Sequence, residues 1–207
     1  MGHKVTYRDY SALADTVLMR KRSKGEQVFL VASPGSREGK TTTAINLAKA
    51  LARSDQQTLL IDLDFEKPEI GAVLGVSAQE PPETTEHPQP VQHEDNLWVL
   101  PAISESPEKL KRIFLGSDKG EELIRIFRNE FDVLIIDSSS RQNNLYVECL
   151  AGLCDGIIIV AQAYHTTAEE VATLSRKVTS GAVVGVVLNN RKEYVPRILR
   201  KLFLGSE

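Results

Sequence analysis

The feature of this sequence that most constrains its fold is a series of apolar runs that alternate with helical segments. From residue 27 onward, the strand-like runs are QVFLVAS (27–33), TLLIDLD (58–64), NLWVLPA (96–102), DVLIIDS (132–138), GIIIVAQA (156–163) and AVVGVVLNN (182–190). Most of them are apolar at successive positions, and a strand of that kind buries both faces of its sheet. The sequence therefore predicts an α/β fold, a doubly wound, mainly parallel sheet with helices on both faces.

Apolar residues at helical spacing fill the intervals between these strands. We expect helices over 40–54, 120–131 and 166–180. The last of them opens on Thr166 and Glu169, whose spacing predicts a capping box. A helix between each pair of strands is what a parallel sheet needs for its crossover connections.

The predicted organisation is a single domain over residues 27–190. It is preceded by an N-terminal helix and a basic linker (1–26) and followed by a basic amphipathic helix (191–207). Within the domain, residues 78–95 read AQEPPETTEHPQPVQHED and are rich in Pro, Glu and Gln. That composition is typical of a solvated, mobile loop.

Composition narrows the classes of function. The net charge of −3 provides no basic field for nucleic acid, so no nucleic-acid partner is expected. No apolar run approaches the ~20 residues that span a bilayer, and no apolar signal segment stands near the start, so a cytoplasmic protein is expected. Cys149 and Cys154 match no zinc spacing and are expected to be reduced residues in or near the core.

The stretch SPGSREGKTTT (33–43) lies between the first strand and the first helix of the domain and has the pattern of a phosphate-binding loop. Its backbone N–H groups would surround the phosphates at the positive end of the helix. Lys40 would reach the β and γ phosphates, and the Thr41 hydroxyl would bind Mg²⁺. The predicted ATP-binding residues of the loop are Gly35, Ser36, Arg37, Glu38, Gly39, Lys40, Thr41 and Thr42. Arg37 could face a phosphate, a partner subunit or only water.

Acidic residues follow two of the predicted strands. Asp62 and Asp64 end the strand 58–64, and Asp137 follows the apolar run VLII as in a Walker B motif. Strand carboxyl ends are where open α/β sheets bind their ligands. Mg²⁺ would be held by Thr41, Asp62 and Asp137, and Lys40, Asp62 and Asp64 would be catalytic. The alternative for Asp64 is that it only caps the following turn.

The motifs EGKTT…NLA, LLIDLDFEKP, FDVLIID, DGIIIVAQ and GVVLNN, in this order, resemble the bacterial tyrosine kinases of capsule and exopolysaccharide synthesis, within the MinD/ParA-like P-loop ATPases. The family pattern D-x-D-x-x-[RK]-P is matched by Asp62, Asp64, Lys67 and Pro68. The resemblance implies ATP with Mg²⁺, Asp62 as a base and Asn189 as a contact to adenine. It also implies a membrane-embedded polysaccharide co-polymerase or activator protein as partner.

The sequence departs from this family in three segments. The tail RKLFLGSE lacks the tyrosine cluster, Ala12 stands where the first arginine of an E-x-x-R-x-x-R motif falls, and SSSRQNNLY follows Asp137 in place of a proline-containing segment. These departures count against self-phosphorylation and ring assembly. They leave the nucleotide site unaffected.

The segment VPRILRKLFLGSE ends the chain with two interpretations open. Apolar residues at helical spacing and basic residues between them would let residues 195–204 lie on an anionic membrane surface. A last helix packed on the sheet has the same pattern. The first would make the protein peripheral at the inner face of the plasma membrane.

Three classes of function can be compared from these residues. The first is a Mg·ATP-dependent, kinase-like ATPase that transfers the γ-phosphate to protein tyrosine or to water. The second is a MinD/ParA-like switch that forms a homodimer or docks on a membrane partner when ATP is bound. The third, a nucleotide-binding scaffold without turnover, is disfavoured by the complete set Lys40, Thr41, Asp62, Asp64 and Asp137.

Overall fold

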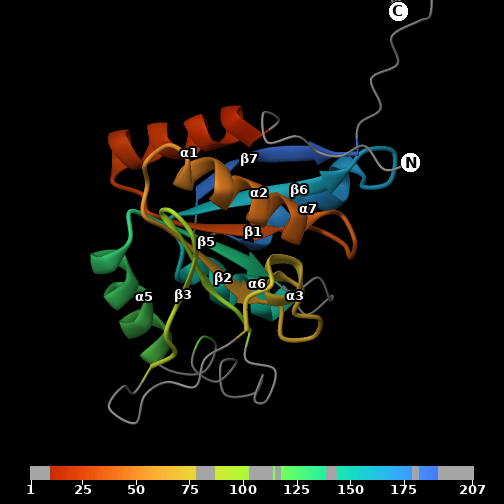
Figure 1. Cartoon of the computed structure of the whole chain (residues 1–207). Coiled ribbons are helices and arrows are strands. Elements are labelled where there is room, and N and C mark those ends of the chain that lie inside the picture. Colours follow the sequence, from red (N-terminus) through yellow and green to blue (C-terminus); the bar gives the residue numbers. More distant parts are fainter. Residues whose placement is uncertain are drawn as a thin grey trace, which may run out of the picture.

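The computed structural model of the 207-residue chain describes residues 10–77, 87–102, 114, 118–138, 144–178 and 182–190. Figure 1 shows strands and helices in alternation, as the sequence predicts. The elements are α1 (Ser11–Lys24), β1 (Val28–Ala32), α2 (Lys40–Ala52), β2 (Thr58–Leu63), α3 (Ile70–Leu74), β3 (Val91–Glu94), β4 (Leu97–Leu100), α5 (Lys119–Glu130), β5 (Val133–Ser138), α6 (Asn144–Gly152), β6 (Gly156–Gln162), α7 (Ala168–Lys177) and β7 (Ala182–Asn189).

The strands form one 7-stranded sheet in the order β3-β4-β2-β5-β1-β6-β7. Neighbouring strands are parallel except for the pair β3 and β4. The doubly wound, mainly parallel sheet that the sequence predicts is thus confirmed. Because β2, β5, β1 and β6 are adjacent and parallel, the loops that follow them meet at one edge of the sheet.

The antiparallel edge strand β3 corrects the expectation that residues 78–95 form a loop throughout. Residues 91–94 are a strand with the sequence VQHE, which pairs with β4. An edge strand needs only one hydrogen-bonded neighbour, and these residues are half-buried or exposed, so polar residues are tolerated there. Residues 78–86 lie outside the described part of the chain.

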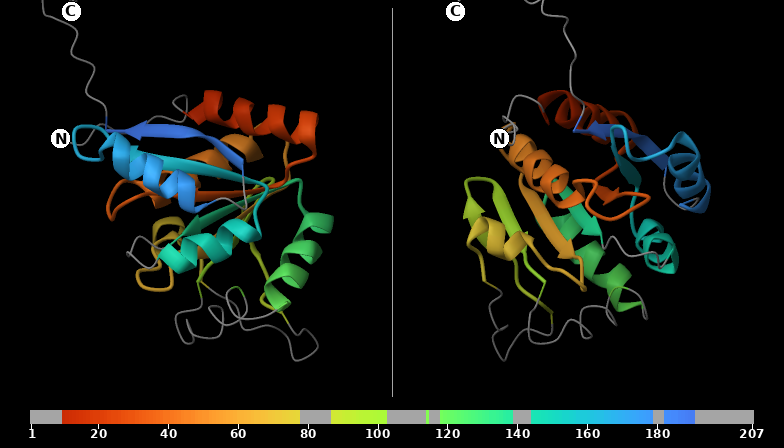
Figure 2. Two further views of the ribbon diagram at one scale, coloured as in Figure 1. Left: turned by 180° about the vertical axis from the view of Figure 1, so that it is seen from behind. Right: turned by 90° about the vertical axis from the view of Figure 1, so that its right-hand side faces the viewer.

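Successive residues of each central strand enter two different hydrophobic cores. In β1, Val28, Leu30 and Ala32 belong to one core, while Phe29 and Val31 belong to the other. The first core is covered by α5, α6 and α7 and the second by α1, α2 and α3, on opposite sides of the sheet (Figure 2). Free Cys154 is buried in the first core, and free Cys149 is half-buried, as expected. Helices on both sides explain why the strands are apolar at successive positions.

The capping box of α7 lies one residue later than predicted. Thr167 is the N-cap: its Oγ1 accepts from the N–H of Glu170 at 3.2 Å, and its own N–H donates to Glu170 Oε2 at 2.8 Å. The prediction that Thr166 caps the helix is wrong, because the Thr166 hydroxyl donates to Glu38 Oε1 and accepts from the N–H of Gln162. A contact with a distant loop thus decides which of two consecutive threonines is the cap.

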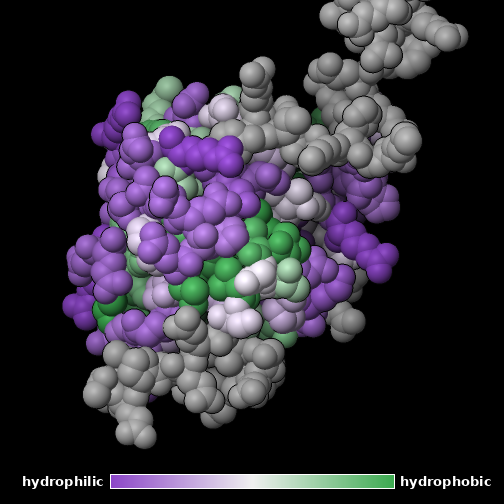
Figure 3. Space-filling view, viewed as in Figure 1, coloured by the Kyte–Doolittle hydropathy of each residue, from purple (hydrophilic) through white to green (hydrophobic). Residues whose placement is uncertain are grey.

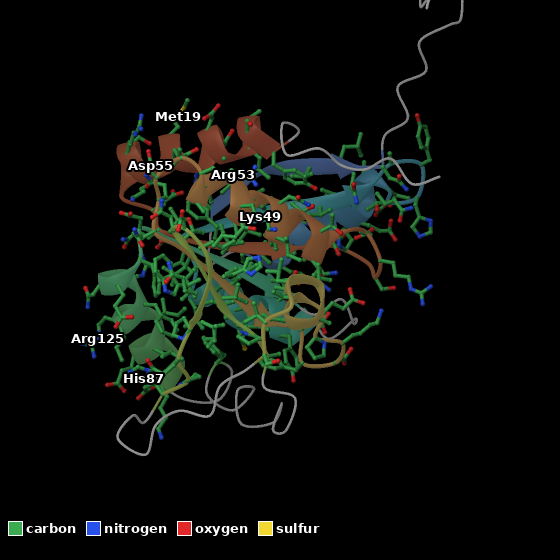
Figure 4. The ribbon with its side chains drawn as sticks, in the orientation of Figure 1. Met19, Lys49, Arg53, Asp55, His87 and Arg125 are labelled. Carbon is green, nitrogen blue, oxygen red and sulfur yellow. The ribbon has the colours of Figure 1, made fainter. Side chains whose placement is uncertain are left out.

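The surface is mostly polar. Charged and polar side chains cover much of the face in Figure 3, and hydrophobic side chains reach the surface near α3, where Val73 is 63% exposed. Lys49 of α2, labelled in Figure 4, forms an ion pair with Glu94 of β3 (Nζ to Oε1, 3.0 Å). In the described part of the chain, no helix is long and apolar enough to cross a bilayer. The predicted amphipathic segment 191–207 is outside that part.

Candidate nucleotide-binding site

The loop between β1 and α2 requires a glycine directly before the helix. Gly39 has a φ of 95°, a left-handed conformation that strains any residue with a side chain. A Cβ at Gly39 would lie 2.0 Å from Nδ2 of Asn189, so a larger residue would displace the Asn189 side chain from its hydrogen bond to the Glu38 carbonyl. Helix α2 begins directly afterwards at Lys40, which places the positive end of the helix dipole at the loop. This is the arrangement that binds phosphate in P-loop proteins.

Other predicted residues of the loop are accessible. Ser36, Arg37 and Thr42 are exposed, and Gly35 and Thr41 are half-buried. Arg37 has a φ of 61°, which is uncommon for a residue other than glycine. Their contacts with ATP stay predictions.

Lys40 is buried against the wall of the loop. Its Nζ donates to Ser33 Oγ at 2.8 Å and to the carbonyl of Gly35 at 3.4 Å, and only 5% of the residue is exposed. Burial lowers the pKa of Lys40, whereas the nearby carboxylates of Asp137, Asp64 and Glu38 raise it. The ammonium group is therefore held beside the acidic residues. Ser33, which the predicted residue set omits, positions it.

Asp62 and Asp137 stand side by side on neighbouring strands. They are register partners in the parallel pair β2 and β5, and 1% and 0% of each residue is exposed. Burial raises the pKa of Asp62 to about 7, although its carboxylate accepts from the N–H groups of Asp64 and Ile70 at 3.0 and 3.2 Å. Burial also raises the pKa of Asp137 to about 8, and the charge of Asp62 adds to this rise. The sheet thus brings two acidic groups together where neither is easily ionised without a cation.

Asp137 has unused hydrogen-bonding capacity in a buried place. Neither carboxylate oxygen has a hydrogen-bond partner among the described residues. The Thr41 hydroxyl lies close enough to lower the pKa of Asp137 without forming a hydrogen bond of good geometry, and the Lys40 ammonium also lowers it, but burial dominates. Buried polar atoms without a partner are rare and often mark a missing ion or water. A carboxylate of this kind fits the Mg²⁺ that the sequence predicts, directly or through a metal-bound water.

Asp64 is a turn residue as well as a member of the site. Its Oδ1 accepts from the N–H groups of Glu66 and Lys67 at 3.2 and 3.0 Å, so Asp64 does cap the following turn. It is 8% exposed, and its charge acts on Lys40, Asp62 and Asp137. Its predicted catalytic role stays a prediction.

Glu38 and Asn189 make contacts within the protein that the sequence did not predict. Glu38 is 3% exposed, and its Oε2 accepts from the N–H of Gly35 at 2.9 Å. The Asn189 Nδ2 donates to the backbone carbonyl of Glu38 at 2.9 Å. The predicted contact of Asn189 with adenine is untested, whereas its contact with the loop is direct. No local sequence signal announced these contacts or the part of Thr166 in them, because they join segments far apart in the chain.

Comparison with known proteins assigns the fold to a family. Residues 29–194 match the family described as the CobQ/CobB/MinD/ParA nucleotide binding domain. The chain belongs to this family. The buried lysine, the glycine of the phosphate loop and the paired aspartates are therefore parts of a nucleotide-binding domain.

The similar proteins include members of the bacterial tyrosine kinase branch. The chain is 31% identical to the tyrosine-protein kinase CpsD of Streptococcus pneumoniae, over 79% of this chain and 75% of CpsD. It is 30% identical to the succinoglycan biosynthesis transport protein ExoP of Rhizobium meliloti, over 89% of this chain but only 24% of ExoP. The solved VpsO kinase domain superposes with a TM-score of 0.69 at 27% identity, covering 88% of this chain and 95% of that domain.

These similarities confirm the predicted resemblance. The chain is a nucleotide-binding P-loop domain of the bacterial tyrosine kinase type within the MinD/ParA-like group. Among the classes of function compatible with the sequence, the kinase-like ATPase is better supported than a non-kinase switch. The chain spans about a quarter of the length of ExoP, so the activity of that whole protein does not transfer directly.

Proposed function

We propose that the protein is a Mg·ATP-dependent phosphotransferase that moves the γ-phosphate of ATP to a tyrosine hydroxyl of another protein, with water as a competing acceptor. The observation that carries the proposal is the pair Asp62 and Asp137, buried side by side on adjacent strands, with the Lys40 ammonium close enough to Asp137 to lower its pKa. Phosphoryl transfer needs a lysine that neutralises phosphate charge. It also needs one acidic group that binds Mg²⁺ and another that accepts the proton of the attacking hydroxyl.

Each of these residues has a separate task in the proposed reaction. The Lys40 ammonium stabilises negative charge on the β and γ phosphates. Asp62 takes the phenolic proton as the new bond between oxygen and phosphorus forms and the bond to ADP breaks. Burial raises the pKa of Asp62 to about 7 in the protein without a bound cation, and a nearby Mg²⁺ would favour the ionised carboxylate that a base requires. Its hydrogen bonds from the Asp64 and Ile70 N–H groups fix the orientation of the carboxylate.

Thr41 and Asp137 would hold the magnesium ion, with Asp62 as a neighbour. The ion would supply positive charge to the phosphate oxygens. In the described part of the chain, no three His, Cys, Asp or Glu side chains converge as a metal cluster. None is needed at a phosphate site, where Mg²⁺ uses one or two protein ligands together with phosphate oxygens and water.

The experiment that tests the proposal separates transfer from hydrolysis. The chain is incubated with Mg·ATP labelled at the γ-phosphate, and phosphotyrosine in added protein acceptors is measured together with released phosphate. We expect both signals in the wild type, and loss of both in Lys40→Ala and Asp62→Asn. Lys49→Ala is the matched control, because Lys49 lies on the same helix but pairs with Glu94 far from the loop.

The outcomes distinguish the candidate classes. Phosphate release with no labelled protein, together with an ATP-dependent increase of mass in solution, would support the MinD/ParA-like switch instead. Labelling that survives in Asp62→Asn would contradict the role of this residue as base. Nucleotide binding without any turnover would leave only the scaffold.

The partners follow from the same proposal. The similar protein ExoP is a succinoglycan biosynthesis transport protein, which supports a membrane-embedded polysaccharide co-polymerase or activator as the partner. A homodimer is the proposed assembly. Residues 195–204 would add a contact with anionic lipid. Vesicle sedimentation with anionic lipid, with and without Mg·ATP, tests that contact, and no pelleting in either state would contradict it.

A further inference from the structure

One buried side chain connects the phosphate loop to two other strand ends. The Glu38 carboxylate accepts from the N–H of Gly35 through Oε2 and from the hydroxyl of Thr166 through Oε1. Its backbone carbonyl accepts from Asn189 Nδ2. Thr166 lies in the connection between β6 and α7, and Asn189 is the last residue of β7. Glu38 therefore joins the ends of β1, β6 and β7.

The partners of Glu38 are themselves held in place. The Thr166 hydroxyl, which donates to Glu38, also accepts from the N–H of Gln162 at 2.9 Å, so its orientation is fixed by the end of β6. The Asn189 side chain donates to Glu38 and accepts from the N–H of Asn190 at 2.9 Å. Of these groups only the Glu38 side chain is buried, so a broken bond to its carboxylate would leave a buried acceptor without that partner.

A carboxylate in a phosphate loop would repel phosphate if it were free to face the ligand. Here 3% of Glu38 is exposed, and both carboxylate oxygens are engaged by the protein. The Gly35 N–H that it fixes belongs to the residue whose carbonyl accepts from Lys40. Glu38 thus acts on the loop conformation and on the position of the lysine, while its charge is occupied elsewhere.

We propose that Glu38 is a positioning residue that holds the phosphate loop in its binding conformation before nucleotide arrives, through the network of Gly35, Thr166 and Asn189. This role belongs to the Glu38 side chain and carbonyl, and the predicted contact of Glu38 with ATP stays a prediction. The inference rests on the proposed binding of nucleotide at this loop. A preformed loop binds more tightly because ordering has already occurred.

The test measures the dissociation constant of a fluorescent ADP analogue with Mg²⁺, together with the unfolding midpoint. We expect Glu38→Ala to weaken binding by roughly 10-fold or more, and Thr166→Val by roughly 3- to 10-fold, values that correspond to one or two lost hydrogen bonds. Thr166→Ser keeps the hydroxyl and should bind like the wild type. The double variant Glu38→Ala/Thr166→Val should bind no more weakly than Glu38→Ala, because the two residues act through one contact.

Thr167→Val is the matched control for stability. It removes the N-cap of α7 next to Thr166 and so lowers the unfolding midpoint, but it leaves the network intact and should leave the dissociation constant unchanged. Hydrogen exchange of the loop amides gives a second readout: in nucleotide-free protein, exchange should be faster in Glu38→Ala and Thr166→Val than in Thr167→Val.

Tighter nucleotide binding by the Glu38 variants would overturn the proposed positioning role. If Glu38 only added negative charge near the phosphates, Glu38→Gln and Glu38→Ala would bind nucleotide more tightly than the wild type. Equal binding by Glu38→Ala and the wild type would also overturn it. A wild-type chain that bound no nucleotide would instead refute the proposed function itself, so the two failures are distinguishable.

Discussion

The two ends of the parallel strands hold aspartates in opposite situations. At the amino ends, Asp155 accepts from the N–H groups of Gln27 and Val28 and from Arg128, and Asp132 accepts from Lys21 and the N–H of Gln57. At the carboxyl ends, Asp137 has no hydrogen-bond partner among the described residues. The amino-end carboxylates are hydrogen-bonded within the protein, whereas the carboxyl-end Asp137 keeps its capacity to accept hydrogen bonds or bind a cation.

The pKa values record the same difference. Burial would raise the pKa of Asp155, but hydrogen bonds from Arg128 and two backbone N–H groups hold it below its ordinary value. The hydrogen bond from Lys21 lowers the pKa of Asp132. Burial raises the pKa of Asp62 to about 7 and that of Asp137 to about 8. The amino end therefore stabilises the fold, and the carboxyl end keeps acidic groups ready for a ligand at a cost in stability.

The largest effect is expected for Asp137→Asn. Turnover should fall by more than about 100-fold, as when a group that stabilises charge in the transition state is removed. The free energy of unfolding of the nucleotide-free protein should instead increase. A carboxyl group whose folded pKa is raised loses its stabilising contribution as pH rises from its unfolded pKa towards about 8.

The variant should therefore gain stability relative to the wild type over that pH range, measured by urea unfolding at pH 5, 6.5 and 8. A uniform loss of stability at all three pH values would show that Asp137 is paired in the same way as Asp155. The comparison between the two ends would then fail.

Asp155→Asn should lower the free energy of unfolding by about 1–3 kcal/mol at pH 7, because it leaves Arg128 or a backbone N–H poorly paired. Because the folded pKa of Asp155 is lowered, the contribution is present above the unfolded pKa and is lost as pH falls through the folded value. The difference between variant and wild type should therefore shrink in acid. Binding of Mg·ADP by the folded protein should be unchanged.

Arg128→Met removes the partner of Asp155 and should have a similar cost. Arg125→Met is its control, since Arg125 lies on the same helix with 75% of its side chain exposed (Figure 4). A loss of nucleotide affinity in Asp155→Asn or Arg128→Met would contradict the separation of stability from function between the two ends.

Lys21→Met should lower the free energy of unfolding by about 0.5–1 kcal/mol. The effect is smaller than that of Asp155→Asn because Lys21 and Asp132 are partly exposed and screened by solvent. Lys21 Nζ also donates to Gln56 Oε1 at 2.9 Å, so a small part of the effect should persist at high salt. Unfolding in urea at 0.05 and 1 M NaCl measures both parts. An effect larger than that of Asp155→Asn would reverse the expected order.

The smallest effect is expected for Arg37→Gly. Left-handed positions at the amino end fall on Gly25, Asp55 and Asn96, which tolerate that conformation. At the carboxyl end they fall on Gly39 and Asn190, but also on Arg37 and Tyr164, which tolerate it less well. Replacement by glycine should raise the free energy of unfolding by about 0.5 kcal/mol. Arg37→Ala keeps the strain and is the control. If both variants were equally stable, the loop would carry no backbone strain at this position.

The sequence was sufficient for much of the fold and for the chemical groups of the site. Continuous apolar strands such as 132–138 predict a sheet covered on both faces, and a strand that ends in Asp predicts a site at its carboxyl edge. These signals are local, so one sequence reveals them. The side-by-side placement of Asp62 and Asp137 also follows, once β2 and β5 are neighbours.

The remaining features depend on contacts between segments that are distant in the chain. The polar segment 91–94 becomes a strand because β4 supplies an edge. Thr166 is not the N-cap of α7, and its hydroxyl donates to Glu38 instead. Asn189 contacts Glu38 because β7 ends beside the loop. Local pattern and spacing contain no information on such pairings, which is why the role of Glu38 emerged only from the structure.

The register of β2 and β5 fixes the distance between the backbones of the two aspartates of the proposed site. Asp62 and Asp137 are opposite each other, so the spacing between their backbones is the constant separation of ~4.8 Å between neighbouring strands. Residues in the covering helices can be substituted without changing this spacing. A single residue inserted into β2 before Asp62 would turn the carboxylate to the opposite side of the sheet. The register of two short strands, more than the identities of the residues around them, therefore keeps Asp62 and Asp137 together at the proposed site.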